Sequence, residues 1–438
     1  MNMTLAKPIL LLSIVLLPSA LSAAEISIDS NTIFRIEKRD MIGSGKDTIM
    51  PATEFIGFDA NRLADTNLSF HFYGWGRMDL KDKSYNDDNA DAGFTYGYLR
   101  YRFNSANADV RAGRFFVHEG IVNEQVDGVS ARTDLPLGFG ISAFGGAPVH
   151  GENLYRENSD GKGDSVVGGR LNYRFKGILD LGVSTVYEGK TPDLLYHTNG
   201  EHRLVGGDIW LTPISWFELI GHTSYNTKTS TVAEHSYLAN IRPLKRLTLS
   251  AQYNESDDQS LFYSWAAFSG AALPSGSKTR TAATTVSYEF SKNVEASTDF
   301  KHYKRDKGEA ERYGGNLKFK FMENSLRTGI GYHYLRAGEG FAIDSNPTAS
   351  YQEARTYAMY DSKTYFTAID LIGQFFKNKV YNKSNALEGR VSIGYHITPT
   401  LAVSGDISCG KNPEFTSETK GLIRLTYNPV FDGKGDKK

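Results

Sequence analysis

The stretch NLSFHFYGWGRMDL, residues 67–80, alternates two kinds of side chain along its whole length. The two sets are Leu68, Phe70, Phe72, Gly74, Gly76, Met78 and Leu80 on one side, and Ser69, His71, Tyr73, Trp75, Arg77 and Asp79 on the other. Alternation with a period of two predicts a β-strand with one apolar and one polar face. In a soluble sheet the apolar face would cover a core, whereas in a membrane-spanning barrel it would meet lipid and the polar face would line the lumen.

The same pattern recurs along the chain. Further copies are the segments 167–175, 179–188, 206–212, 217–226, 246–255, 283–290, 313–321, 326–335, 387–396 and 401–408. Most of them approach the length of about 9–11 residues that a tilted strand needs to cross a bilayer, whereas strands of soluble proteins average about 5–6 residues. Closing such an array into a barrel removes its unpaired edges. The recurrence therefore favours a membrane-spanning barrel whose polar face is the lumen.

The connections between these segments alternate between short and long. Short connections such as 104–108, 176–177 and 291–293 alternate with long polar segments such as 148–163 and 255–278. Outer-membrane barrels have tight periplasmic turns and long extracellular loops. This parity therefore predicts that both termini lie in the periplasm.

Counting with this parity predicts 22 strands, the first near 32–37 and the last near 421–427. The segment 354–376 must then form a hairpin that turns at 361–363. If 368–376 is instead a helix in the lumen, the count falls to 18 or 20, since even numbers are the rule. The predicted fold class is all-β: a single-chain antiparallel transmembrane β-barrel of 22 strands, with 18–22 compatible with the pattern.

The N-terminus has the order of a secretory signal peptide: Lys7, the apolar run 9–17, then small residues. The alternative, a membrane anchor, is disfavoured because a spanning helix needs about 20 apolar residues. We expect a signal peptide at 1–24 and a single barrel domain at 25–438 with a short periplasmic C-terminal tail. Cys409 is the single cysteine, which excludes a disulfide within the chain. A formal charge of −1 gives no general attraction to nucleic acid.

The stretch VRAGRFFVHEGIVNEQVDGVSAR, residues 110–132, together with the signal peptide and the strand array of 25–431, resembles the Gram-negative outer-membrane porins. The resemblance implies a barrel in the cell outer membrane that acts as a passive diffusion channel for small hydrophilic solutes or ions. Porins typically end on an aromatic residue, whereas here DGKGDKK follows Phe431. The residue that closes the barrel is therefore not given by the motif.

The polar face carries arginines in the first third of the barrel and acidic residues further around it. The candidate lumen residues are Arg77, Arg100, Arg102, Arg111, Arg132, Arg170 and Arg174, followed by Asp180, Asp208, Glu218, Glu289 and Asp299. Separate clusters of opposite sign would set a transverse field and give the pore some preference for anions. Alternatively, neighbouring charges neutralise each other across the ladder, as Arg100 and Asp109 would.

No HExxH or comparable motif is present, so we expect no enzyme activity, no cofactor and no metal site. A second hypothesis is a barrel that acts as the sheath of a porin–cytochrome electron-transfer conduit and holds a multi-haem cytochrome as partner protein. The expected partners are outer-membrane lipid and lipopolysaccharide, small solutes and no nucleic acid, with a homo-oligomer left open. The apolar segment 261–278 is a candidate constriction or contact with a partner or lipopolysaccharide.

Overall fold

The computed structural model describes residues 25–41, 45–81, 90–149, 165–189, 202–257, 278–305, 308–338, 350–413 and 415–432. The predicted signal peptide 1–24, residues 261–277 of the apolar segment 261–278, and the C-terminal residues 433–438 lie outside these ranges. The first half contains the strands β1 (Glu25–Met41), β2 (Gly45–Ile49), β3 (Pro51–Asn61), β4 (Leu68–Asp79), β5 (Ala90–Phe103), β6 (Ala108–Glu119), β7 (Val122–Asp134), β8 (Phe139–Pro148), β9 (Ser165–Phe175), β10 (Leu179–Gly189), β11 (His202–Ile214) and β12 (Phe217–Asn226).

The second half continues the same alternation of strands and turns. Its strands are β13 (Thr231–Leu244), β14 (Leu247–Asp257), β15 (Lys278–Ser291), β16 (Val294–Arg305), β17 (Gly308–Phe321), β18 (Leu326–Ala337), β19 (Tyr351–Asp361), β20 (Tyr365–Val380), β21 (Lys383–Thr398), β22 (Leu401–Lys411), β23 (Phe415–Tyr427) and β24 (Val430–Asp432). Short 3₁₀ turns occupy Leu63–Asp65 (η3), Pro136–Gly138 (η4) and Met322–Asn324 (η6). In the part of the chain that the structure describes, no helix is both long and apolar enough to cross a membrane.

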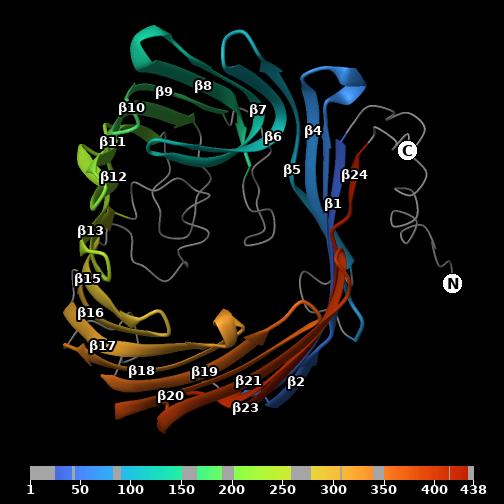
Figure 1. Cartoon of the computed structure of the whole chain (residues 1–438), viewed down its shortest axis with the longest axis vertical. Coiled ribbons are helices and arrows are strands. Elements are labelled where there is room, and N and C mark those ends of the chain that lie inside the picture. The colour runs from blue at the N-terminus through green and yellow to red at the C-terminus, as the bar shows by residue number, and fades with distance from the viewer. Residues whose placement is uncertain are drawn as a thin grey trace, which may run out of the picture.

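The sheet closes on itself as an antiparallel barrel (Figure 1). Consecutive strands pair along the chain, and β1 pairs with β3 on one side and with β23 on the other. β2 and β3 pair with the same strand and act as one, interrupted at Met50, while β24 continues β23 after residues 428–429. The barrel therefore has 22 strands, which confirms the predicted fold class and strand number.

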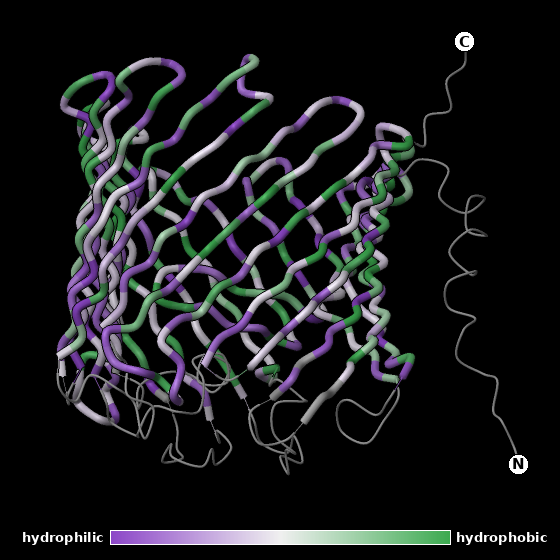
Figure 2. Tube along the Cα trace, turned by 90° about the horizontal axis from the view of Figure 1, so that it is seen from below, coloured by the Kyte–Doolittle hydropathy of each residue, from purple (hydrophilic) through white to green (hydrophobic). Residues whose placement is uncertain are grey.

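The two faces of the wall differ in chemistry as the sequence predicted. On β10, for example, Leu181 and Val183 of the outer face are 43% and 62% exposed. The hydropathy of the trace changes from residue to residue along each strand (Figure 2). Glu25 pairs with both Asn61 and Asp432, so both ends of the described chain lie at the end of the barrel that carries the short turns.

Several boundaries differ from the sequence prediction. The first strand begins at Glu25 rather than near 32, and the last begins at Phe415 rather than near 421. The segment 354–376 forms β19 and β20 around a turn at 362–364, so the alternative of a lumen helix at 368–376 is wrong. Poor alternation there reflects Ala368, Ile369, Leu371 and Ile372, which place apolar side chains on both faces.

Candidate functional site

The end of the β6–β7 hairpin leaves the barrel wall. β6 pairs with β5 only as far as Arg114, and β7 pairs with β8 only from Val126 onward. Residues 115–125 between these points, here called the inner hairpin, form strand pairs only with each other, apart from the Gln125 carbonyl at the base, which accepts from the N–H of Val149. At its tip the backbone N–H of Ile121 donates to Ser184 Oγ on the inner face of β10, at 3.2 Å. The inner hairpin therefore reaches across the interior towards β10 (Figure 1).

Two glycines permit this bend at the base of the hairpin. Gly113 has a φ of +127°, and a Cβ there would lie 2.3 Å from the carbonyl oxygen of Gly97. A Cβ on Gly128, which pairs with Gly113, would lie 2.1 Å from the carbonyl oxygen of Gly145. Any side chain at these positions would collide with neighbouring backbone, so the close approach of the strands requires glycine.

An apolar cluster holds the inner hairpin in place. It contains Phe115, Val117, Ile121, Val122, Val126, Phe144, Val166, Val186, Leu204 and Ala233. Phe115 of the inner hairpin, Val126 at its base, and Val166 and Val186 of the wall are each no more than 1% exposed. Burying one such side chain contributes about 1.5–3 kcal/mol, so the cluster offsets much of the conformational entropy lost when the hairpin is ordered.

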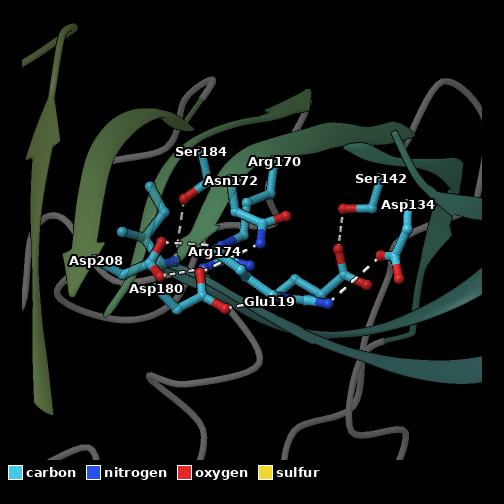
Figure 3. A network of polar contacts seen from close by, with 10 residues as sticks. Glu119, Asp134, Ser142, Arg170, Asn172, Arg174, Asp180, Ser184 and Asp208 are labelled. Atoms are coloured by element: carbon cyan, nitrogen blue, oxygen red, sulfur yellow. Dashed lines mark hydrogen bonds and ion pairs between the residues drawn. The ribbon is translucent and has the colours of Figure 1, made fainter. Parts of the chain in front are cut away.

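A polar cavity lies between the inner hairpin and the wall strands β6–β9. Its volume is about 540 Å³, and its polar lining includes the residues Asp109, Arg111, His118, Glu119, Arg132, Asp134, Ser142, Arg170, Asn172 and Arg174. We call it the arginine pocket. Figure 3 shows the carboxylates and guanidinium groups of this region turned towards one another.

The first set of ion pairs surrounds Asp109, which is 4% exposed. Arg132 Nε donates to its Oδ2 at 2.5 Å, and Arg100 Nη2 donates to the same oxygen at 3.1 Å. Arg111 Nε lies 3.4 Å from Oδ1. One buried carboxylate thus fixes the position of three guanidinium groups.

The second set lies where the hairpin tip meets the wall (Figure 3). Arg170 contacts both carboxylate oxygens of Asp208, at 3.0 and 2.5 Å, and donates to Asp180 at 3.0 Å. Arg174 donates to Asp180 at 2.9 Å and lies 3.4 Å from Asp134. A Cβ on Gly120 would lie 2.9 Å from Asp208 Oδ2, so the tip rests directly on this network.

The charges of the two sets balance. With Glu119, which accepts a hydrogen bond from Ser142 on β8, the site holds five arginines and five carboxylates. Guanidinium groups nevertheless face the cavity more than several of their partners do: the side chains of Arg132 and Arg174 are 48% and 54% exposed, against 5% and 22% for Asp109 and Asp180. The arrangement can therefore present hydrogen-bond donors to an anionic group.

The remaining candidate residues lie elsewhere on the inner face. Arg77 stands opposite Asp91 in the register, and Arg102 stands opposite Asp109 but forms no ion pair with any described residue. Glu218 accepts hydrogen bonds from Trp210 Nε1 at 3.3 Å and from Asn240 at 3.2 Å.

Glu289 and Asp299 belong to the other side of the barrel. Glu289 faces Glu295 across β15 and β16, and Asp299 contacts Arg312 at 3.1 Å and His333 at 2.8 Å. A second cavity of about 430 Å³ lies there, with Glu353 and Arg355 in its lining.

Sequence reasoning named most of the arginine pocket but missed the inner hairpin, Glu119 and Asp134. The available signal was the loss of alternation at Phe115, Phe116 and Val117, followed by a two-residue turn where long connections are the rule. Arg100 and Arg170 each form an ion pair with a nearby carboxylate. These contacts favour neutralisation between neighbouring charges over separate clusters of opposite sign. Whether these residues set ion selectivity stays a prediction. No group of three or more His, Cys, Asp or Glu side chains that could hold a metal occurs among the described residues.

The sequence matches no family model and no curated protein. The structure is similar to the ferric enterobactin receptor PfeA of Pseudomonas aeruginosa, with 9% identity over 93% of this chain and 80% of the receptor chain and a TM-score of 0.57. It also matches a BenF-like porin from Pseudomonas fluorescens Pf-5, with 10% identity, 93% and 99% coverage and a TM-score of 0.47.

A third match is OccAB2 of Acinetobacter baumannii, with 11% identity, 94% and 99% coverage and a TM-score of 0.46. Identities this low are informative about the fold alone. The likeness to the receptor, whose TM-score is above 0.5, agrees with the closed antiparallel barrel and confirms, at the level of the fold, the outer-membrane-type β-barrel that the sequence predicted.

Proposed function

We propose that this chain is an outer-membrane porin, a passive diffusion channel for small hydrophilic solutes or ions whose narrow section is formed by the inner hairpin. The observation that carries the proposal is the departure of residues 115–125 from the wall to pack on the inner face of β9, β10 and β11. A closed barrel with an apolar outer face, whose short turns lie at the same end as Glu25 and Asp432, supports insertion with that end in the periplasm.

The proposed channel has a weak preference for anions. The arginines and carboxylates of the two ion-pair sets, counted together with Glu119, balance in number, so no strong field is expected from them. The most exposed guanidinium groups, those of Arg132 and Arg174, are the ones that a solute entering the pocket meets, and Arg102 adds a cation without an ion-pair partner among the described residues. Guanidinium groups stay charged at any working pH and bind carboxylate or phosphate groups through paired donors.

The sheath hypothesis predicts an interior kept clear for a partner protein. The inner hairpin occupies part of the interior beside β9, β10 and β11, which supports the channel over the sheath. The absence of enzyme activity and the partners named from the sequence stay expectations.

A planar bilayer tests the proposal. Purified protein alone should give stable open steps, and replacing Arg102, Arg132 and Arg174 together with Ser should shift the reversal potential in a salt gradient away from anions. Replacing Arg336 on the outer face of β18 with Ser is the control and should leave selectivity unchanged. Pure protein that stays silent, and conducts or transfers electrons only with a restored partner, would support the sheath instead.

A further inference from the structure

Three side chains near the end of the barrel with the short turns are joined by a chain of hydrogen bonds. Ser69 Oγ lies 2.9 Å from Nε2 of His71 on the same strand, β4. The other ring nitrogen of His71, Nδ1, lies 2.5 Å from Oδ1 of Asp59 on β3. We call these three residues the serine cluster. They stand in the order that a serine nucleophile, its general base and the carboxylate that orients the base require.

The serine cluster faces the lumen. Ser69 and His71 are two positions apart and share a face of β4, and Asp59 stands opposite His71 in the register. On the other side His71 pairs with Tyr98, which packs against the apolar cluster of the inner hairpin. The side chains of His71 and Asp59 are 17% and 42% exposed. Water and a solute in the lumen can therefore reach the serine cluster.

Two contacts hold the imidazole ring of His71. Asp59 fixes its Nδ1, and the ring stacks on Tyr98 with the centroids 4.9 Å apart and the planes at 26°. A neutral imidazole that donates from Nδ1 to a carboxylate leaves Nε2 to accept the proton of a hydroxyl. The other acceptor near Ser69 Oγ, the carbonyl oxygen of Arg100, is 3.4 Å away, which is long for a hydroxyl donor. The Ser69 proton is therefore directed to His71.

Donor side chains stand on both sides of Ser69. Asn61, the last residue of β3, continues the register to the position beside Ser69. On β5, Ser69 pairs with Arg100, and Arg102 is the next residue of the same face. Arg102 forms no ion pair with any described residue. Amide and guanidinium N–H groups can stabilise the negative oxygen of a tetrahedral intermediate, and a guanidinium also binds a carboxylate of the substrate.

We propose that the serine cluster hydrolyses carboxylic esters of small anionic solutes that enter the lumen. This activity goes beyond the proposed channel and departs from the absence of enzyme activity expected from the sequence. Ser69 Oγ attacks the ester carbonyl carbon, the carbonyl π electrons move to oxygen, and the hydroxyl proton passes to Nε2 of His71. The bond from the carbon to the alcohol oxygen then breaks, and the departing alcohol takes the proton from His71.

Water completes the reaction. It attacks the acyl carbon held on Ser69 and gives a proton to His71; the bond from that carbon to Ser69 Oγ then breaks, and Oγ takes the proton back. One ester and one water yield one carboxylic acid and one alcohol, so no further reactant is needed. Asp59 does not contact the substrate. It is a positioning residue that orients His71 and stabilises its protonated form.

A fluorophosphonate probe tests the nucleophile, because it labels a serine whose hydroxyl is activated by a base. Full-length protein in detergent should carry the label on Ser69, located by peptide mass spectrometry, and Ser69→Ala and His71→Asn should each lose it. Ser392→Ala is the control and should keep the label, since Ser392 donates to the carboxylate of Asp406 on the inner face of the far wall. Unlabelled Ser69 in the folded parent, or equal labelling in His71→Asn, would overturn the proposal.

The rate of labelling tests the role of Asp59. Asp59→Asn should slow the labelling of Ser69 about a hundredfold or more, while the final label per barrel should reach that of the parent. A merely structural role would lower the final label instead, because part of the protein would be misfolded. Heat-modifiable migration on gels shows that each variant is folded. Labelling of Asp59→Asn at the parent rate would contradict the positioning role.

Hydrolysis of 4-acetoxybenzoate tests the reaction and its substrate class. The parent should release 4-hydroxybenzoate faster than Ser69→Ala, and Arg102→Gln should raise KM several-fold for this anion but not for the neutral 4-acetoxybenzamide. Equal release by the parent and Ser69→Ala would overturn the activity, and equal KM of Arg102→Gln and the parent would overturn the anionic class. Because these assays use protein in detergent, a barrel that stays silent in a bilayer would contradict the proposed channel alone.

Discussion

Two hairpins of this barrel extend beyond their neighbours, and they behave differently. The inner hairpin, 115–125, turns at Gly120 and Ile121 and folds into the barrel. The end of the β20–β21 hairpin, 377–386, here called the solvated hairpin, turns as tightly and lies beyond the last pairs of β20 with β19 and of β21 with β22. Turn length and strand pairing therefore do not decide which hairpin enters the lumen.

Side-chain chemistry and the base of each hairpin explain the difference. The inner hairpin has Phe115, Val117 and Ile121 in a buried cluster. The solvated hairpin instead carries Lys377, Lys379 and Lys383, and most of its residues are exposed to solvent. The wall strands opposite the inner hairpin supply matching apolar side chains. An infolded hairpin thus needs glycine at its base and an apolar partner on the wall.

Blocking the bend should have the largest effect on this comparison. Gly128→Leu places a Cβ where the carbonyl oxygen of Gly145 is 2.1 Å away, so the inner hairpin cannot fold in and we expect a several-fold drop in the yield of heat-modifiable barrel. Gly405→Leu on β22 is the control, because its Cβ has an ordinary contact at 3.6 Å. Equal yields of the two variants would show that the bend does not depend on glycine.

The second largest effect is expected from neutralising the buried carboxylate of Asp109. Asp109→Asn leaves three guanidinium groups around a 4% exposed site, and we expect a loss of about 3 kcal/mol in the free energy of unfolding. Asp370→Asn breaks the exposed pair with Arg355 on the other wall and should cost less than about 1 kcal/mol. Denaturant titration in detergent measures both, and the reverse ranking would contradict the assigned burial.

The strand array could be predicted from the sequence because alternation is local: about ten residues are enough to identify the apolar and the polar face of a strand. The inner hairpin could not, because its direction depends on contacts between Phe115 and wall residues such as Val186 and Leu204, far along the chain. Those wall residues do interrupt otherwise polar faces, but the sequence alone does not say what covers them. Asp134 could not be predicted as a residue of the site, because it is the last residue of β7 and lies beside a turn.

Packing of the inner hairpin offers a smaller effect. Val122→Ala removes two methyl groups at a position that is 3% exposed, and we expect a loss of about 1–3 kcal/mol in the free energy of unfolding. Val183→Ala, on the outer face at 62% exposed, should cost less than about 1 kcal/mol. Unfolding midpoints of the two variants in the same detergent give the comparison, and similar losses at both positions would mean that the hairpin is not packed on the wall.

The smallest effect is expected at the solvated hairpin. Lys379→Ile adds apolar surface to the solvated hairpin but gives it no apolar cluster on the wall to pack against. The conductance and the unfolding midpoint of the variant should therefore stay within error of the parent. A clear fall in conductance would mean that one apolar side chain suffices to draw a hairpin inward, which would remove the need for the wall residues.

The central claim is that the inner hairpin narrows the channel. Deleting residues 116–125 with a two-residue turn in their place should raise single-channel conductance in a planar bilayer several-fold, because the narrow section sets the resistance. Deleting 377–386, the same number of residues from the solvated hairpin, should leave conductance unchanged. Equal conductance of the parent and both deletion variants, each folded by the heat-modifiability test, would contradict the account.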